Sequence, residues 1–308
     1  MMKPYLWQGM RIPNRLLAVG FTIASLLSAC EFSDTDKAEI PAYIYIPSFT
    51  FNTDTTLANY EGQNSNRFTD MWITSSGNSL GTIGLPVLIP VPQSGTAQIG
   101  VDAGIIKSGQ DNVRIAYPMV ATYYTTVQLA PDKIDTIRPV FRYLDNVTFP
   151  LITDYDKIST SRGFTLNQTY ASPGDSLAGV NDNQSWAPNN WYLKCIVSPQ
   201  STAFQMYTSE EYSLPGQGAP VYIEVDYRTN MLLQFGYYYQ EPNQPASLAT
   251  PVMELYPTDT WKKIYINLTD EISIRRANTK FKFYFGFFNN TGTVQPELSF
   301  DNIKLVTF

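Results

Sequence analysis

Residues 280–288 read Lys-Phe-Lys-Phe-Tyr-Phe-Gly-Phe-Phe, the clearest strand pattern in the chain. In an extended strand, successive side chains point to opposite faces of a sheet. The four phenylalanines at alternate positions from Phe281 to Phe287 therefore share one face, opposite Lys282, Tyr284 and Gly286. The pattern predicts a strand whose phenylalanine face lies in the core.

The same alternation recurs on both sides of this strand. Residues 220–228 place Val221, Ile223, Val225 and Tyr227 on one face and Tyr222, Glu224, Asp226 and Arg228 on the other. We interpret the charged face as solvated, which is typical of a half-buried strand. Residues 261–268 and 298–306 follow the same pattern, and the best helical candidate, 269–278, is only a turn or two long. The sequence predicts an all-β protein.

The strand-like segments divide into two groups, which predicts two tandem β-sandwiches, at 40–145 and 146–308. Within the first, residues 54–66 are polar and rich in turn formers, so we expect a long surface loop there. The order Leu80-Gly81, Leu85-Pro86, Ile89-Pro90, Gly95, Ile99-Gly100-Val101, Gly104 resembles small Ig-like or PEGA-like sandwich modules of bacterial envelopes. This resemblance covers residues 72–106 and implies an Ig-like sandwich.

The second segment resembles the jelly-roll sandwich of carbohydrate-binding modules. The matching features are Trp261-Lys262-Lys263, the phenylalanine-rich strand, and the closing Phe300-Asp301-Asn302-Ile303-Lys304-Leu305. The resemblance implies a jelly roll over residues 146–308. It also implies that a glycan can bind by stacking on exposed aromatic side chains.

The N-terminus carries a targeting pattern. Leu27-Ser28-Ala29-Cys30 resembles the lipobox of bacterial lipoproteins, and the uncharged segment 16–29 is shorter than a membrane-spanning helix of about 20 residues. The resemblance implies removal of a signal peptide, 1–29, and a covalent lipid on Cys30. The acidic segment 31–39 reads as a flexible tether and resembles the export signal of surface-exposed Bacteroidetes-type lipoproteins. We therefore expect a chain anchored to the outer membrane and facing the cell exterior.

Composition narrows the possible functions. The chain contains no histidine, which excludes Ser-His-Asp catalysis and His-ligated metal sites. Its net charge of −6 argues against a nucleic-acid partner, because binding phosphates requires clustered Lys and Arg. Apart from Cys30, the only cysteine is Cys195, which we expect to be a buried thiol.

Aromatic side chains supply the candidate contact residues. They are Trp186, Trp191, Tyr238, Trp261 and Tyr265, which can contact a glycan or a protein partner. In the run 237–239, Tyr237 and Tyr239 share a face and Tyr238 points the opposite way, so at least one face belongs to the core. Both interpretations, a glycan platform and structural packing, stay open.

Carboxylates give weaker indications. The visible pairs are Asp154/Asp156, Glu210/Glu211, Glu224/Asp226 and Asp270/Glu271, and none predicts the paired acids of a glycosidase. We expect no enzymatic activity and no catalytic residue. Asp301 matches an acidic position in the last strand of jelly-roll modules, some of which hold a structural calcium ion, so Asp301 is the candidate metal ligand. We expect no other cofactor.

Two functions remain. In the first, the chain is a structural subunit of an outer-membrane protein complex and grips β-barrel or other envelope proteins. In the second, its jelly roll captures polysaccharide for uptake or adhesion. Exposed aromatics beside Asn or Asp favour the second, and a large exposed apolar patch favours the first.

Overall fold

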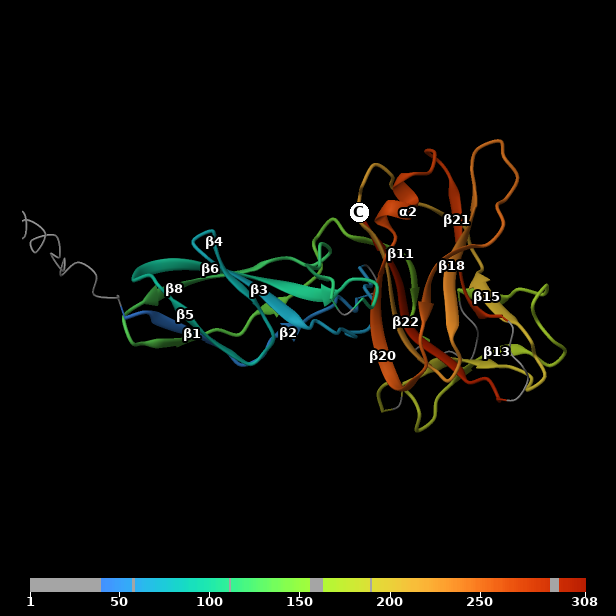
Figure 1. Ribbon diagram of the computed structural model, residues 1–308, viewed down its shortest axis with the longest axis horizontal. Helices are drawn as coiled ribbons and strands as arrows, with labels where there is room; N and C mark the ends of the chain where they lie inside the picture. Colours follow the sequence, from blue (N-terminus) through green and yellow to red (C-terminus); the bar gives the residue numbers. More distant parts are fainter. Residues whose placement is uncertain (1–39, 57–58, 111, 156–162, 189, 289–293) are drawn as a thin grey trace, which may run out of the picture. The chain divides into compact units, whose positions relative to one another are not determined.

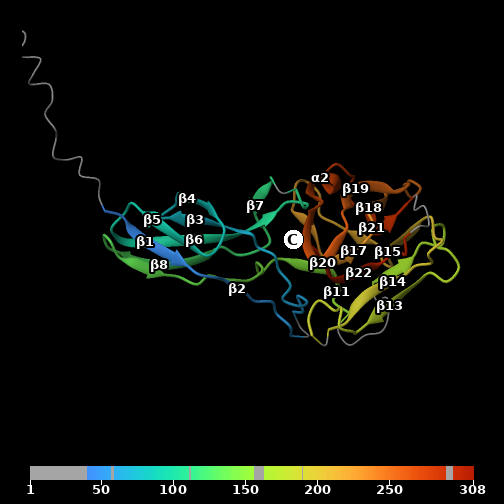
Figure 2. The same cartoon turned by 60° about the horizontal axis from the view of Figure 1, so that its bottom comes forward.

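Alternating apolar side chains form strands throughout the part of the chain that the structure describes (Figures 1 and 2). The computed structural model describes residues 40–56, 59–110, 112–155, 163–188, 190–288 and 294–308. The predicted signal peptide, Cys30 and the tether up to residue 39 lie outside the described residues. The all-β prediction is confirmed: the one described helix is α2 (Thr269–Ser273). None of the described helical segments has the length and apolar character needed to cross a membrane.

Strands β1 to β10 and the loops between them form the N-terminal sandwich. Its smaller sheet has the order β5-β1-β9, with bounds Val87–Val91, Ala42–Ile46 and Ile134–Thr136. Its larger sheet has the order β4-β3-β6-β7, with β8 also paired to β6; the bounds are Asn78–Ile83, Asp70–Ser75, Gly95–Ile106, Arg114–Ala116 and Tyr123–Leu129. A parallel ladder joins β2 (Thr50–Phe51) to β10 (Val140–Phe141). Ile44, Ile73 and Ile99 are fully or almost fully buried in one core cluster, to which both sheets contribute.

Strands β11 to β22 form the C-terminal sandwich, which has two sheets. The β22 sheet has the order β13-β14-β22-β17-β20, with β11 also paired to β22; the bounds are Ser176–Val180, Tyr192–Ile196, Leu298–Thr307, Val221–Thr229, Thr258–Asn267 and Thr148–Thr153. The β21 sheet has the order β12-β15-β21-β18-β19, with β16 also paired to β21; the bounds are Phe164–Leu166, Phe204–Thr208, Lys280–Phe287, Leu233–Gln240, Thr250–Leu255 and Tyr212–Ser213.

The predicted phenylalanine core is confirmed. Phe281, Phe283, Phe285 and Phe287 on β21 are at most 2% exposed and belong to the core cluster of the C-terminal sandwich. Phe283 stacks on Phe235 of β18, with 6.2 Å between the ring centroids. Burying an aromatic side chain of this size stabilises the fold by roughly 2–3 kcal/mol. Cys195 is also buried here as a free thiol, as expected.

The outer face of the β22 sheet is not solvated, contrary to the sequence interpretation. Tyr222, Tyr265 and Val306 on this face belong to the core cluster of the N-terminal sandwich. Glu224 and Asp226, from the row read as solvent-facing, are each 1% exposed. The alternation identified two faces correctly, but the second face is covered by the preceding half of the chain.

Loops from the N-terminal sandwich complete this contact. Ser108 donates its backbone N–H to the carbonyl of Tyr265 at 2.9 Å, beside an isolated bridge between Lys107 and Tyr265. Ser65, from the predicted surface loop, is buried and donates its hydroxyl to Asp226. The prediction of a surface loop is therefore wrong at Ser65. Residues 41–308 form a single unit, so a boundary between independently folding domains at 145/146 stays a prediction.

Candidate functional site

The outer face of the β21 sheet gathers side chains that the core does not use. On β21 the residues that alternate with the phenylalanines include Lys280, Lys282 and Tyr284, and they point away from the core. Antiparallel pairing sets Tyr238 of β18 opposite Lys282, and Tyr207 of β15 opposite Tyr284. Three strands from distant parts of the sequence thus bring aromatic, amide and ammonium groups together.

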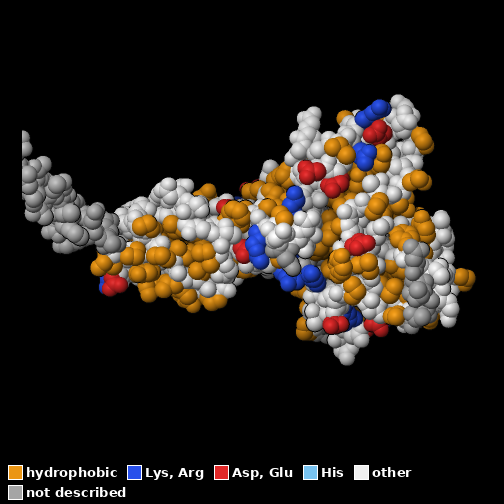
Figure 3. All heavy atoms as spheres, viewed as in Figure 1, with side chains coloured by type: hydrophobic (Ala, Val, Ile, Leu, Met, Phe, Trp, Pro, Cys, Tyr) orange, Lys and Arg blue, Asp and Glu red, His pale blue; other side chains and the backbone are white. Residues whose placement is uncertain are grey.

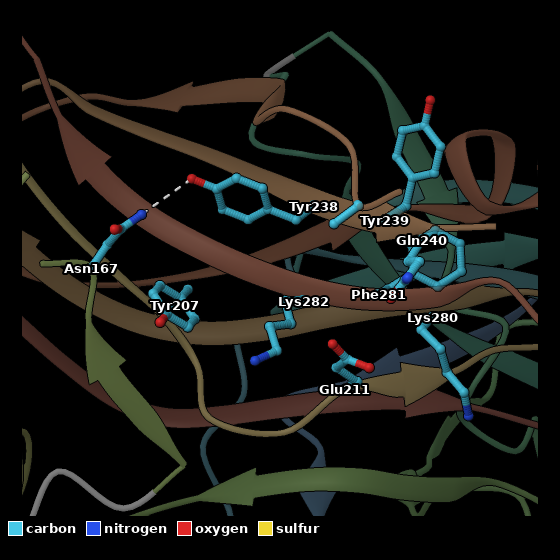
Figure 4. A pocket seen from close by; sticks show the side chains of 10 residues that line it. Asn167, Tyr207, Glu211, Tyr238, Tyr239, Gln240, Lys280, Phe281 and Lys282 are labelled. Atoms are coloured by element: carbon cyan, nitrogen blue, oxygen red, sulfur yellow. Dashed lines mark hydrogen bonds between the residues drawn. The ribbon is translucent and has the colours of Figure 1, made fainter. Parts of the chain in front are cut away.

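These side chains line a cleft of about 290 Å³, which we call the β21 cleft. Its lining residues are Asn167, Tyr207, Glu211, Tyr238, Tyr239, Gln240, Ala246, Lys280, Phe281 and Lys282. Figure 4 shows Asn167 at one end, Gln240 and Lys280 at the other, and Tyr207, Tyr238 and Lys282 around the space between them. The lining combines apolar ring surface with a few polar groups, the usual character of a ligand site.

Tyr238 is held in a fixed orientation by two amide side chains. Its hydroxyl donates to Oε1 of Gln205 at 2.7 Å, and Nδ2 of Asn167 donates to the Tyr238 oxygen at 3.3 Å. The same Nδ2 donates to Gln205 Oε1 at 2.5 Å. Burial raises the pKa of Tyr238, so the phenol stays protonated at neutral pH and keeps its donor. The ring is therefore positioned before any ligand arrives.

A second tyrosine, Tyr284 on the neighbouring strand β21, packs against the ring of Tyr238. Tyr284 is fully buried, and its ring centroid lies 5.5 Å from that of Tyr238. Its hydroxyl donates to Oε1 of Gln234 at 2.9 Å. Tyr284 can lie there because its neighbour is Gly236: a Cβ at position 236 would come within 2.5 Å of the Tyr284 hydroxyl and 2.4 Å of the Thr250 carbonyl oxygen.

Charged groups occupy the open side of the cleft. Nζ of Lys282 lies 5.2 Å from the centroid of the Tyr207 ring and donates a long hydrogen bond, 3.4 Å, to the carbonyl of Ser209. Lys280 donates to the Ser213 hydroxyl at 2.7 Å. Glu211 is the only carboxylate among the lining residues.

The structure separates the five predicted aromatic contacts. Tyr238 alone lines the β21 cleft. Trp261 donates its ring N–H to the Gln184 carbonyl at 2.7 Å, on the other sheet, and Trp186 is 36% exposed in the nearby loop. Trp191 packs against the core of the C-terminal sandwich.

Tyr265 requires a correction. It is 3% exposed, its hydroxyl accepts a hydrogen bond from the Arg67 backbone N–H at 2.9 Å, and its ring stacks on Phe68. Because the N-terminal sandwich covers it, Tyr265 is not available to an external ligand.

The candidate metal ligand is also buried. Asp301 accepts hydrogen bonds from Nδ2 of Asn190 at 2.7 Å and from the Asn302 backbone N–H at 2.8 Å. Burial raises its pKa well above the usual range of an aspartate. Among the described residues there is no group of three or more His, Cys, Asp or Glu that could hold a metal ion, so the calcium prediction gains no ligand set.

Of the predicted carboxylate pairs, Glu224/Asp226 is not open to a ligand. Glu224 and Asp226 are buried, and Nζ of Lys263 lies 3.3 Å from one and 3.9 Å from the other. Asp156 lies outside the described residues.

Of the residues that line the cleft, only Tyr238 was predicted as a contact residue from the sequence. Tyr207 and Gln205 lie on β15, where their alternation with buried Phe204 and Met206 was the available signal. Asn167 follows the short strand β12 in a segment that we interpreted as loops.

Comparison with known proteins gives likenesses of architecture at low identity. No protein-family model matches the chain, and no curated protein matches it. A carbohydrate-binding module of the β-sandwich superfamily matches with a TM-score of 0.39 and 10% identity, over 87% of this chain and 99% of that one. The xylan-binding domain CBM22-2 of Paenibacillus barcinonensis Xyn10C matches with a TM-score of 0.34 and 11% identity, over 51% and 98%.

A third likeness is to the enzymatically active domain of tailspike protein 4 from bacteriophage CBA120. It has a TM-score of 0.37 and 9% identity, and covers 56% of this chain but only 26% of that one. The chain thus spans about a quarter of the tailspike domain. The likenesses to the two carbohydrate-binding modules are likenesses of β-sandwich fold.

Proposed function

We propose that the β21 cleft binds a glycan. The observation that carries the proposal is the fixed ring of Tyr238, held by Asn167 and Gln205 on the floor of a concave surface that also contains Tyr207. A pyranose ring has an apolar C–H face and a rim of hydroxyls. An aromatic face beside amide groups complements both features.

A buried amide fixes the ring that a sugar would stack on. Gln205 is fully buried, and its Oε1 accepts hydrogen bonds from both Tyr238 and Asn167. The polar groups that hold Tyr238 thus come from the protein itself, and its ring does not have to be ordered when a ligand binds.

The test is glycan binding by the intact chain, first on an array and then by titration calorimetry. Tyr238→Ala removes the stacking face, and we expect about a tenfold loss of affinity, equivalent to about 1.4 kcal/mol. Tyr238→Phe keeps the face and loses the hydrogen bonds, so it should bind more weakly than wild type and more strongly than Tyr238→Ala.

Tyr124→Ala is the matched control, because Tyr124 is a 62% exposed tyrosine on β8, outside the cleft. Binding that is equally weakened by Tyr124→Ala and Tyr238→Ala, or unaffected by both, would refute the cleft as the site.

A second candidate function is that of a subunit in an outer-membrane complex, and a different surface supports it. The outer face of the β5-β1-β9 sheet carries Tyr45, Leu88 and Ile134, which are 36%, 49% and 60% exposed. Register places Leu88 opposite Tyr45 on neighbouring strands. Figure 3 shows hydrophobic side chains gathered over the region that Figure 1 labels β1 and β5. Such a patch suits a protein interface.

The subunit proposal predicts that envelope proteins, including β-barrel proteins, co-purify with the tagged chain in mild detergent. Leu88→Lys should abolish this recovery, and Leu248→Lys, the same change at an 89% exposed leucine of the C-terminal sandwich, should not. Recovery of the chain alone from its native membrane contradicts the proposal.

Membrane attachment through Cys30 and display on the cell exterior remain proposals from the sequence. Mass spectrometry of the purified chain tests the first, since a lipid on Cys30 adds the mass of acyl groups and Cys30→Ser removes it. Protease accessibility on intact cells tests the second.

A further inference from the structure

We infer that the β21 cleft prefers an acidic glycan, one whose sugar carries a carboxylate. We infer also that Lys282 is the residue that binds this carboxylate. The inference rests on the proposed glycan function and goes beyond it by naming the ligand class. It follows from where the cations of the cleft lie. Lys280 and Lys282 are two residues apart on β21, so both point to the outer face beside the Tyr238 ring.

Lys282 is positioned to meet a ligand that stacks on the tyrosines. It pairs with Tyr238 across the β18–β21 ladder, and its ammonium group lies 5.2 Å from the Tyr207 ring centroid. Among the described residues, its one hydrogen bond is the 3.4 Å contact with the Ser209 carbonyl, which leaves donor capacity on an ammonium group that has three protons. Figure 4 shows this ammonium beside the space that Tyr207 and Tyr238 border.

The charge balance of the cleft differs from that of the whole chain. The chain carries a net charge of −6, yet its cleft is lined by two lysines and one glutamate. Neither lysine has a carboxylate within 4 Å among the ion pairs of the described residues, whereas the buried Lys263 has two. A neutral sugar gives these ammonium groups no counter-charge.

A uronic acid complements both the tyrosine rings and the lysines of the cleft. Its ring offers the C–H face that stacks on tyrosine, and its carboxylate, attached directly to that ring, can accept a charge-assisted hydrogen bond from lysine. Lysine supplies a point charge with three donors on a flexible stem, so a single charge-assisted contact with a carboxylate requires no fixed bidentate geometry. Glu211, on the same side, disfavours polymers with dense negative charge, so we assign the preference to carboxylated rather than heavily sulfated glycans.

The experiment is titration calorimetry of the full chain with oligosaccharides of galacturonate, mannuronate and glucuronate. Each is compared with its carboxyl-reduced form, which keeps the ring and replaces the carboxylate by a primary alcohol. We expect at least one uronate to bind roughly five- to tenfold more tightly than its reduced form, the effect of one charge-assisted hydrogen bond at a partly exposed site. The difference should shrink in high salt, because screening weakens exposed charge pairs.

Variants assign the effect to a residue. Lys282→Gln should remove the preference for the acid while leaving the affinity for the reduced sugar unchanged, and Lys282→Arg should restore most of it. Lys133→Gln, an exposed lysine in the N-terminal sandwich, is the matched control and should change neither. Heparin oligosaccharides test the sulfated alternative. Tighter binding of heparin than of every uronate would overturn the assignment.

Failure of this inference can be told apart from failure of the proposed function. Equal, Tyr238-dependent binding of uronates and their reduced forms overturns the acidic preference and leaves glycan binding standing. The absence of Tyr238-dependent binding to any sugar overturns both.

Discussion

The phenol hydroxyl of Tyr117 donates a 2.7 Å hydrogen bond to Oε1 of Glu224, and the two residues belong to different sandwiches. Tyr143 donates to the same oxygen at 2.9 Å, and Lys263 Nζ lies 3.3 Å from the other carboxylate oxygen. A single buried carboxylate therefore receives donors from the N-terminal sandwich and a cation from its own sheet. This arrangement couples the stability of the two sandwiches.

Removing one donor from this carboxylate should destabilise the chain. Tyr117→Phe leaves Glu224 buried with one hydrogen bond fewer, and we expect the free energy of unfolding to fall by about 1–3 kcal/mol. Urea unfolding followed by tyrosine and tryptophan fluorescence measures the change. Tyr124→Phe changes the same group at an exposed position and should be nearly neutral; equal losses in the two variants would contradict the role of the buried bond.

Removing the cation should cost more. Lys263→Met removes the cation that lies within 4 Å of both Glu224 and Asp226, and breaking a buried pair in this way typically costs about 3–5 kcal/mol. The same unfolding measurement applies, with the exposed Lys133→Met as control. A loss below 1 kcal/mol would mean that the two carboxylates are compensated by other groups.

We expect the buried Lys304 to make the free energy of unfolding depend on pH. Burial lowers its pKa to about 8, whereas a lysine in an unfolded chain titrates near 10.4. Between these values the unfolded chain binds a proton that the folded chain does not, so stability rises with pH by at most about 1.4 kcal/mol per unit. Above about pH 10 the buried tyrosines, whose pKa burial raises, act in the opposite direction.

The measurement is the free energy of unfolding from pH 8 to 10 in wild type and in Lys304→Met. The free energy of unfolding of wild type should rise relative to that of Lys304→Met as pH rises, because wild type loses the penalty of its buried charge. Parallel curves would show that Lys304 keeps an ordinary pKa in the folded chain.

Gly236→Ala tests the support beneath the cleft. The added Cβ would meet the Thr250 carbonyl at 2.4 Å and the Tyr284 hydroxyl at 2.5 Å, so backbone or ring must shift. We expect a loss of about 1–3 kcal/mol in stability and weaker glycan binding, because Tyr284 packs beneath Tyr238. Gly216→Ala, where a Cβ meets nothing within 4 Å, is the control. Unchanged binding in a folded Gly236→Ala would show that Tyr284 does not position Tyr238.

Local alternation made part of the site predictable. The opposed directions of Tyr237 and Tyr238 follow from the period of a strand, and the structure places Tyr237 in the core at 1% exposure and Tyr238 in the cleft. Tyr207 and Gln205 were not predicted. They reach Tyr238 only because β21 lies between β15 and β18, a pairing that no local pattern encodes.

The charged face of β17 shows the limit of the same reasoning. Glu224 and Asp226 read as solvent-facing because charged residues are seldom buried without partners. Their partners, Tyr117, Tyr143 and Ser65, come from positions 81 to 161 residues away in the sequence. The prediction failed because burial of a charge depends on what another part of the chain brings to it.

The all-β class, the phenylalanine core of β21 and the outward direction of Tyr238 could be predicted from the sequence, because each depends on the two-residue period of a strand. Which outer face is open and which is covered depends on how distant segments pack in three dimensions. The N-terminal sandwich covers the outer face of the β22 sheet, so the aromatic and charged residues of that face are buried. The outer face of the β21 sheet kept an open cleft, so Tyr207, Tyr238 and Lys282 stayed available to a ligand.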